Sequence, residues 1–248
     1  MTPLPSPFLR LPLAHRGYHD AALGRPENGL SAFRAAVDAG YGIELDLQPS
    51  TDGHAMVFHD PSLDRMTREF GPVRDRTASA LGEIALLKSQ DTIPTLGEVL
   101  DLVNGRVPLL LELKNQEHRD DAVLETATAK ALAGYSGPVA VMSFNPVMVA
   151  RLAELIPAIP RGLTTDDFNY EPLSKARREH LREMRDFDEV GASFISHDAL
   201  DLDRAGVAEI KAQGFPILTW TVRSPEAEHK ARRIADNITF EGYAAAFP

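Results

Sequence analysis

Segments typical of buried strands alternate with segments typical of helices along the chain, and this alternation limits the possible folds more than any other feature. Eight apolar runs bounded by turn residues have the composition of strands: residues 11–15, 41–47, 107–114, 139–144, 159–165, 192–197, 215–220 and 237–243. The segments between them carry apolar residues at helical spacing, several begin at Ser, Thr, Asn or Asp, and three end at Gly. This pattern is typical of parallel βαβ units, and eight units predict a closed (β/α)8 TIM barrel of the α/β class.

The connections between these segments indicate how the chain is divided. They are short and include no linker rich in Gly, Ser or Pro, so we expect a single TIM-barrel domain over residues 1–248. One longer excursion, at about residues 54–93, predicts a small insertion after the second strand, since long loops in compact domains usually carry function or structure of their own. The alternative is an open doubly wound sheet, which shares the local pattern, but the sequence contains no resemblance to its glycine-rich phosphate loop.

Composition and charge exclude several classes of protein. With 44% hydrophobic and 25% charged residues, the chain can bury an ordinary core and solvate its surface. A formal net charge of -10 argues against a nucleic-acid partner, because a protein that binds phosphate backbones gathers Lys and Arg on one face. A small anionic substrate would therefore need a local concentration of positive charge.

The absence of cysteine and the first residues bear on chemistry and location. Without cysteine, disulfides, thiolate metal sites and cysteine nucleophiles are excluded. The start of the chain, MTPLPSPFLRLPLAH, is broken by four prolines and has neither the pattern of a signal peptide nor that of a membrane span. We therefore expect a cytoplasmic protein with no stable membrane insertion.

Polar residues at the carboxyl ends of the expected strands predict a metal site, because these ends converge on the mouth of a parallel barrel. Glu44 and Asp46 are two residues apart and share one face of their strand, and Glu112 and Lys114 repeat this spacing on the next. Three carboxylates that meet without compensation repel one another, so we expect a hard divalent cation with oxygen ligands, Mg²⁺ or Ca²⁺. Alone, Glu44 and Asp46 could instead be solvated residues of an edge strand, but the second pair favours the metal site.

Two histidines are candidates for acid–base catalysis, since imidazole exchanges protons near neutral pH. His15 and His59 are this pair, although either one taken singly could be structural. Arg16 stands at a strand end, which suits it to bind an anion, and Asp60 could either orient His59 or cap the next turn. His197 ends the sixth expected strand, which also faces the mouth.

Several motifs occur along the chain in a fixed order. They are AHRG at 14–17, PENGLSAF at 26–33, ELDLQPSTDGHAMVFHDPSLDRMT at 44–67, LLLELK at 109–114 and TWTV at 219–222. Their combination is far more specific than any one of them and spans nearly the whole chain. On these motifs the chain resembles the glycerophosphodiester phosphodiesterase family, in its bacterial, cytoplasmic type.

The resemblance implies a fold and a reaction. The fold is a TIM barrel with a small insertion after the second strand, and the reaction is metal-dependent hydrolysis of glycerophosphodiesters to glycerol 3-phosphate and an alcohol. In the mechanism proposed for the family, the glycerol hydroxyl next to the ester attacks phosphorus to give a cyclic phosphate, which water then opens. One histidine removes a proton and the other protonates the departing alkoxide, and the sequence leaves open which does which.

The resemblance also implies roles for individual residues, carried over motif by motif. One divalent cation, Mg²⁺ or Ca²⁺, would be bound by Glu44, Asp46 and Glu112. The general base and acid would be His15 and His59, and the phosphate would be held by Arg16 and Lys114. Glu27 and Asn28 of the PEN motif would shape the site, and Trp220 would either pack beside the glycerol or belong to the core.

The sequence departs from the family pattern at two places. Gly29 follows PEN where the family usually has threonine, and the last strand reads ITFEGY where the family often ends ITDxP. We expect that strand end, with Phe240 and Glu241, to face the substrate and to affect selectivity for its glycerol or alcohol part.

Two alternative functions remain open. One is a phosphodiesterase of related barrel type that acts on lysophospholipid or sugar phosphodiesters, which would show as apolar surface at the mouth. The other is a barrel that binds a glycerol phosphate group without turning it over. Both histidines and all three carboxylates are present, which argues against the second alternative, because a binding protein needs no acid–base pair.

Overall fold

The computed structural model describes residues 1–116, 121–169 and 173–248, and its centre is a closed barrel of eight parallel strands. Each barrel strand pairs with the next, and β1 pairs with both β2 and β9 to close the ring. The strands are β1 Leu13–Ala14, β2 Gly42–Pro49, β4 Leu109–Leu113, β5 Val139–Ser143, β6 Arg161–Thr165, β7 Phe194–Asp198, β8 Ile217–Val222 and β9 Asn237–Phe240. All eight fall within the runs expected from the sequence or overlap them, so the TIM-barrel prediction is confirmed and the open sheet is excluded.

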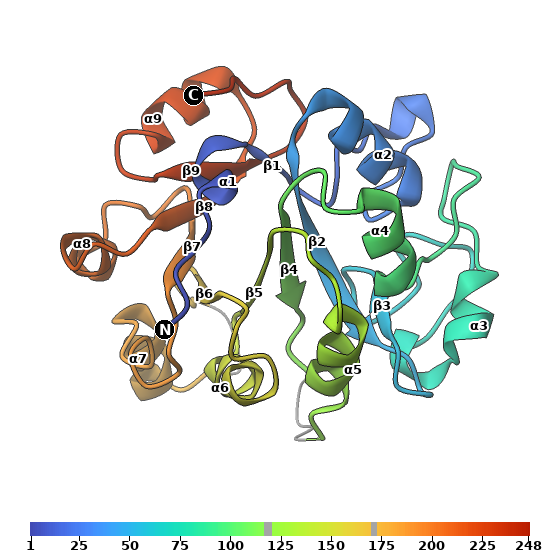
Figure 1. The fold of residues 1–248 in the computed structure, drawn as a ribbon, viewed down its shortest axis with the longest axis horizontal. Helices are drawn as coiled ribbons and strands as arrows, with labels where there is room; N and C mark the ends of the chain where they lie inside the picture. Colours follow the sequence, from blue (N-terminus) through green and yellow to red (C-terminus); the bar gives the residue numbers. More distant parts are fainter. Residues whose placement is uncertain (117–120, 170–172) are drawn as a thin grey trace.

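Helices of seven to ten residues surround the strands (Figure 1). They are α2 Leu30–Ala39, α4 Leu96–Val103, α5 Val123–Leu132, α6 Pro146–Leu155, α7 Lys175–Arg182, α8 Ala205–Ala212 and α9 Pro225–Ala231. Their ends follow local signals: Thr95 and Glu98 form a capping box at the start of α4, and Gly40 ends α2 in the left-handed conformation. Within the described ranges, no helix has the length and apolar character needed to cross a membrane.

The barrel interior is filled by side chains and is closed at its amino end. The interior layer consists of Leu13, Leu110, Ala140, Met142, Phe194 and Leu218. The short helix α1 Pro7–Arg10 packs Phe8 against this layer, and the Asn237 side chain donates hydrogen bonds to the carbonyls of Phe8 and Leu11, both at 2.7 Å. The carboxyl end is thus the end available for a site.

Phe240, which the sequence places at a substrate-facing strand end, lies in the apolar layer outside the barrel strands. Its ring contacts Tyr41, with centroids 4.7 Å apart, and Tyr18, with centroids 6.1 Å apart, and the residue is 1% exposed. Successive side chains of a strand point to opposite faces, so when Phe240 packs outward, Glu241 turns toward the mouth. The expectation that Phe240 faces the substrate is therefore wrong.

The segment after β2 forms a small structure of its own beside the barrel (Figure 1). Strand β3 Ala55–Val57 returns antiparallel to β2, with Val57 opposite Leu47, and is followed by the 3-10 turn η2 Val73–Asp75 and helix α3 Ala78–Gly82. These pieces share an apolar cluster made by Met56, Phe58, Leu63, Val73, Ala78, Leu81, Ile84, Leu86 and Ile93. The hairpin fixes the position of residue 59 above the end of β2.

Gly162 in β6 tests the packing of the barrel interior. A Cβ at this position would lie 2.4 Å from the ring of Phe194, which is fully buried and has no room to move. We expect Gly162→Ala to lower the free energy of unfolding by about 1–3 kcal/mol through overpacking, measured by urea denaturation. Gly82→Ala is the matched control, because no atom lies within 4 Å of its Cβ position, and equal stability of the two variants would contradict this description of the interior.

Candidate active site

A cavity of about 210 Å³ opens at the carboxyl ends of the barrel strands. Seven of the residues expected from the sequence line it: His15, Arg16, Glu44, His59, Glu112, Lys114 and Trp220. The other three contact this lining through hydrogen-bonded or ion-paired side chains: Glu27 with Arg16, Asp46 with Lys114, and Asn28 with Asp46. The fold therefore brings all ten expected residues together, as parallel strands do with side chains at their carboxyl ends.

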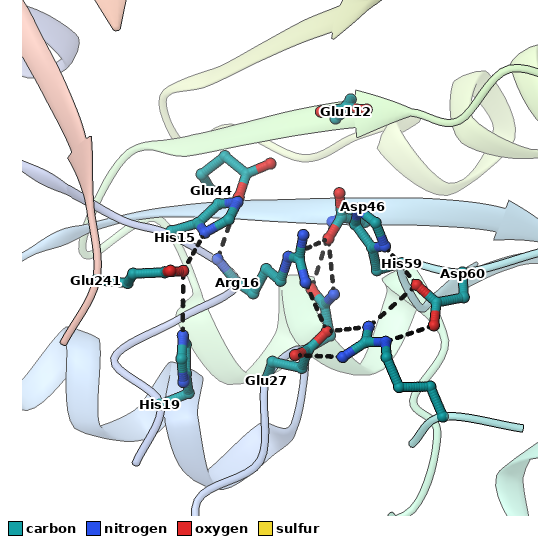
Figure 2. Close-up of polar contacts among 12 residues, drawn as sticks. His15, Arg16, His19, Glu27, Glu44, Asp46, His59, Asp60, Glu112 and Glu241 are labelled. Carbon is teal, nitrogen blue, oxygen red and sulfur yellow. Dashed lines mark hydrogen bonds and ion pairs between the residues drawn. The ribbon is translucent and has the colours of Figure 1, made fainter. Parts of the chain in front are cut away.

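Glu44, Asp46 and Glu112 form a buried cluster of carboxylates (Figure 2). Asp46 and Glu112 stand opposite each other in the β2–β4 register, and Glu44 shares their face two residues earlier on β2. One oxygen from each side chain lies within 4.8 Å of the other two, and none of the three residues is more than 6% exposed. In the part of the chain that the structure describes, this is the one group of acidic or histidine side chains with metal-binding geometry.

Lys114 compensates part of the negative charge of this cluster. Its Nζ lies 2.7 Å from Asp46 Oδ1 and 2.6 Å from Glu112 Oε1. Burial alone would lower the pKa of Lys114, but the two carboxylates outweigh burial and raise it. Burial would likewise raise the pKa of Asp46, but Lys114, followed by His59 and Arg16, outweighs burial and lowers it. Asp46 and Lys114 are therefore a charged pair at neutral pH.

Glu44 and Glu112 have less compensation than Asp46. Burial, with the added repulsion of Asp46 and Glu112, raises the pKa of Glu44 well above its usual range. Burial is also the first cause that raises the pKa of Glu112, since Lys114 offsets only part of it. A divalent cation would remove this penalty, and three hard carboxylate oxygens are the donors that Mg²⁺ and Ca²⁺ prefer. The residues present fit such an ion.

His15 is held between the first and last strands of the barrel. Its backbone N–H donates to the carbonyl of Phe240 at 2.9 Å, its Nδ1 lies 2.5 Å from Glu241 Oε2, and its Nε2 lies 3.9 Å from Glu44 Oε2. Burial is the main cause that lowers the pKa of the His15 imidazole below its usual value, so the ring is neutral at neutral pH. A neutral imidazole that faces a buried carboxylate cluster is able to accept a proton.

His59 is held in a similar way on the opposite side of Asp46 (Figure 2). Its Nδ1 lies 2.6 Å from Asp60 Oδ1, and Arg65 Nε donates to Asp60 Oδ2 at 2.6 Å. Of the two roles considered for Asp60, the structure shows the orientation of the imidazole. Burial is again the first cause that lowers the pKa of His59, and only weaker contributions oppose it. In both histidines, Nδ1 is therefore hydrogen-bonded to a carboxylate.

The PEN motif supports Arg16 and Asp46 from below the cavity. Arg16 Nη1 donates to Glu27 Oε1 at 2.8 Å, and Arg65 donates to both oxygens of Glu27 at 2.7 and 2.9 Å. Asn28 Nδ2 donates to Asp46 Oδ2 at 2.8 Å. The buried Arg16 Nε lies 3.3 Å from Asp46 Oδ2, so that Arg16 and Asp46 form an ion pair although this contact lacks hydrogen-bond geometry.

An aromatic wall closes one side of the cavity. Trp220 and Phe144 both line it, with their rings edge-to-face and their centroids 5.6 Å apart. The Trp220 Nε1 donates to the carbonyl of Ser196 at 3.0 Å, which fixes the indole. The sequence left open whether Trp220 packs at the site or in the core, and the structure places it in the cavity wall.

His197, the other histidine at a strand end, does not line the cavity. The residue is fully buried, its Nδ1 lies 2.8 Å from Thr165 Oγ1, and its Nε2 lies 3.1 Å from the carbonyl of Asp201. With both ring nitrogens engaged by its neighbours, His197 is a structural residue, although it lies near the end of β7.

Sequence reasoning missed two contacts that organise the site. Arg65 links Asp60 to Glu27, and Glu241 contacts His15 from the other end of the chain. The signal for Arg65 was present, since it lies within the quoted motif around His59. Glu241 was noted as a departure at the last strand, but its partner was not foreseen.

Comparison with known proteins found a family model and several relatives. A model of the Glycerophosphoryl diester phosphodiesterase family matches residues 15–237. A glycerophosphodiester phosphodiesterase of Caldanaerobacter subterraneus subsp. tengcongensis is 29% identical over 242 residues, which cover 92% of each chain. One of Bacillus altitudinis is 34% identical over 170 residues, which cover 64% of this chain and 68% of the relative. A phosphodiesterase of Oleispira antarctica, solved with its product sn-glycerol-3-phosphate, superposes with a TM-score of 0.78 at 25% identity, covering 94% of this chain and 93% of that one.

The carboxylate cluster predicts that divalent cations stabilise the folded protein. We expect Mg²⁺ or Ca²⁺, added to chelator-treated protein, to raise the thermal midpoint, since a ligand at 100 times its Kd contributes about 2.7 kcal/mol. Glu112→Gln removes one carboxylate of the cluster and is expected to abolish the shift in a thermal scan. Glu179→Gln, a change at an exposed carboxylate of α7, is the control, and a shift that survives Glu112→Gln would place the cation elsewhere.

Proposed function

Since the chain belongs to the glycerophosphoryl diester phosphodiesterase family and is therefore a phosphoric diester hydrolase, we propose that it hydrolyses glycerophosphodiesters to glycerol 3-phosphate and an alcohol. The observation that carries the proposal is the arrangement at the barrel mouth. Two histidines, each with a carboxylate on Nδ1, line the same small cavity as Glu44 and Glu112 of the carboxylate cluster. The product bound by the Oleispira antarctica phosphodiesterase is consistent with this substrate class.

We assign Glu44, Asp46 and Glu112 as ligands of one divalent cation, Mg²⁺ or Ca²⁺. When bound, the cation would polarise a phosphoryl oxygen and stabilise the charge that develops on it. Lys114 and Arg16 line the same cavity and supply further positive charge, to which the nonbridging oxygens of a phosphodiester bind. The cation, Lys114 and Arg16 would concentrate positive charge in a protein whose formal net charge is -10.

The two histidines would exchange protons with the substrate. One accepts the proton of the glycerol hydroxyl next to the ester, and the hydroxyl oxygen bonds to phosphorus to form a cyclic phosphate. The bond from phosphorus to the alcohol breaks, and the other histidine protonates the departing alkoxide. Water then opens the ring with the duties of the two histidines reversed, which gives glycerol 3-phosphate and restores both imidazoles. His15 and His59 fill these two duties.

The aromatic wall favours one related substrate class as a second candidate. Trp220 and Phe144 present apolar surface beside the phosphate-binding residues, as expected for an enzyme that accepts the acylated glycerol of a lysophospholipid. This candidate retains the metal, the histidines and the departing alcohol, and changes only the glycerol part, so that its product is an acylglycerol 3-phosphate. A barrel that binds without turnover would have no use for two oriented imidazoles.

Three further predictions from the sequence belong to the same proposal. Residues 1–248 form one catalytic domain, the segment at about 54–93 is its insertion, and the protein works in the cytoplasm on a small-molecule substrate without a nucleic-acid partner. The hairpin that carries His59 supports the first two, because it places an insertion residue in the barrel cavity.

The proposal is tested by release of glycerol 3-phosphate from a panel of glycerophosphodiesters, and of acylglycerol 3-phosphate from lysophospholipids. The protein is first treated with chelator and then assayed with and without Mg²⁺ or Ca²⁺. We expect release that requires the metal, and the ranking within the panel identifies the alcohol. Absence of release from every member with either metal would contradict the proposal.

Removal of one histidine separates turnover from binding. We expect His59→Ala to lower kcat by about 10²–10⁴-fold, the usual contribution of a general acid or base, while binding of glycerol 3-phosphate persists in calorimetry. His54→Ala is the matched control, since His54 lies in the turn before β3, the strand that leads to His59, and its side chain is 53% exposed. Equal activity of the two variants would remove His59 from the mechanism.

A further inference from the structure

We propose that Glu241 is the positioning residue of His15, which holds the imidazole in place so that Nε2 faces the cavity. The inference rests on the proposed function, in which His15 exchanges a proton with the substrate. Glu241 Oε2 lies 2.5 Å from His15 Nδ1, although the two residues are 226 positions apart (Figure 2). Glu241 acts through His15 and does not line the cavity itself.

The closure of the barrel creates this contact. Strand β1 pairs in parallel with β9, with Ala14 opposite Phe240, so that the next residue on each strand, His15 and Glu241, leaves the barrel side by side. The hydrogen bond from the His15 backbone N–H to the Phe240 carbonyl at 2.9 Å fixes the backbone from which the imidazole projects. The carboxylate of Glu241 then determines the rotation of the ring.

The contact also selects one tautomer of the imidazole. An ionised carboxylate only accepts hydrogen bonds, so Nδ1 of His15 must carry the proton that it donates to Glu241. In the neutral ring, Nε2 is then the unprotonated nitrogen, and it lies toward Glu44 at 3.9 Å. A carboxylate on one nitrogen that fixes the other as the acceptor is the arrangement used by many catalytic histidines.

Glu241 is itself held in place by a second partner. Arg223 Nε donates to Glu241 Oε1 at 2.7 Å, so the two carboxylate oxygens are divided between an arginine and a histidine. Nε2 of His19 lies 3.7 Å from Oε2 as well. The hydrogen bond from His15, followed by the nearby His19, is the main cause that lowers the pKa of Glu241, so the carboxylate is ionised and able to accept the Nδ1 proton.

The other catalytic histidine has the same support from a different part of the chain. Asp60 lies 2.6 Å from His59 Nδ1, and Arg65 holds Asp60. Each imidazole is therefore backed by a carboxylate, and each carboxylate is backed by an arginine. This symmetry suits a reaction in which the two histidines exchange the roles of base and acid between its two steps.

Kinetics of Glu241 variants test the assignment. We expect Glu241→Ala to lower kcat by about 10²–10⁴-fold with little change in KM, because the loss of an orienting carboxylate affects the transition state and not substrate binding. Glu241→Gln is expected to lose a similar amount, because its amide oxygen accepts from Arg223 and its NH2 then faces Nδ1, which favours the wrong tautomer. Glu226→Gln, an exposed change on α9, is the control, and wild-type kcat in Glu241→Ala would overturn the proposal.

A double variant shows whether Glu241 acts through His15. We expect His15→Ala and His15→Ala with Glu241→Ala to have the same kcat, because the effect of a positioning residue disappears with the residue that it positions. A purely structural role would lower kcat further in the double variant, and that result would overturn the proposal.

The tautomer can be observed without any substrate. In protein with ¹⁵N-labelled histidine, we expect the long-range ¹⁵N–¹H spectrum to show His15 protonated on Nδ1, and Glu241→Ala to give a mixture of tautomers. Protonation on Nε2 in the wild type would overturn the inference. If the wild type releases no glycerol 3-phosphate, the proposed function fails while this spectrum still decides the role of Glu241.

Discussion

The mutual repulsion of Glu44, Asp46 and Glu112 is the interaction around which the rest of the site is arranged. Three carboxylates with almost no exposure would be costly to bury as anions without compensation. Lys114 supplies one positive charge between two of them, and Asn28 donates a hydrogen bond to Asp46. Burial, together with the remaining negative charge, raises the pKa of Glu44 and Glu112. The barrel mouth is therefore suited to a divalent cation and, through it, to a phosphodiester.

Three features of the fold bring the other functional groups to this cluster. The alternation of side chains along a parallel strand places Glu44 and Asp46 on one face, opposite Glu112 on the next strand. The antiparallel hairpin after β2 brings His59 back over the same point. The closure of the barrel sets the end of the last strand beside the end of the first, which joins Glu241 to His15.

Much of this arrangement could be predicted from the sequence, because local patterns determine it. The strand and helix periods gave the barrel, and the two-residue spacing of the carboxylates gave their common face. The contact of Glu241 with His15 could not be foreseen, since it depends on the register of β9 against β1 and joins residues 226 positions apart. Phe240 was misplaced for a related reason: a strand end faces the mouth as a whole, but the direction of each side chain depends on register.

The proposed function requires the carboxylate cluster to hold a divalent cation. An anomalous difference map from crystals grown with Ca²⁺ and glycerol 3-phosphate would show whether it does. We expect a peak among Glu44, Asp46 and Glu112, with the phosphate beside Arg16 and Lys114 and between the two histidines. A map with no peak at saturating Ca²⁺, with Lys114 still bridging Asp46 and Glu112, would contradict it.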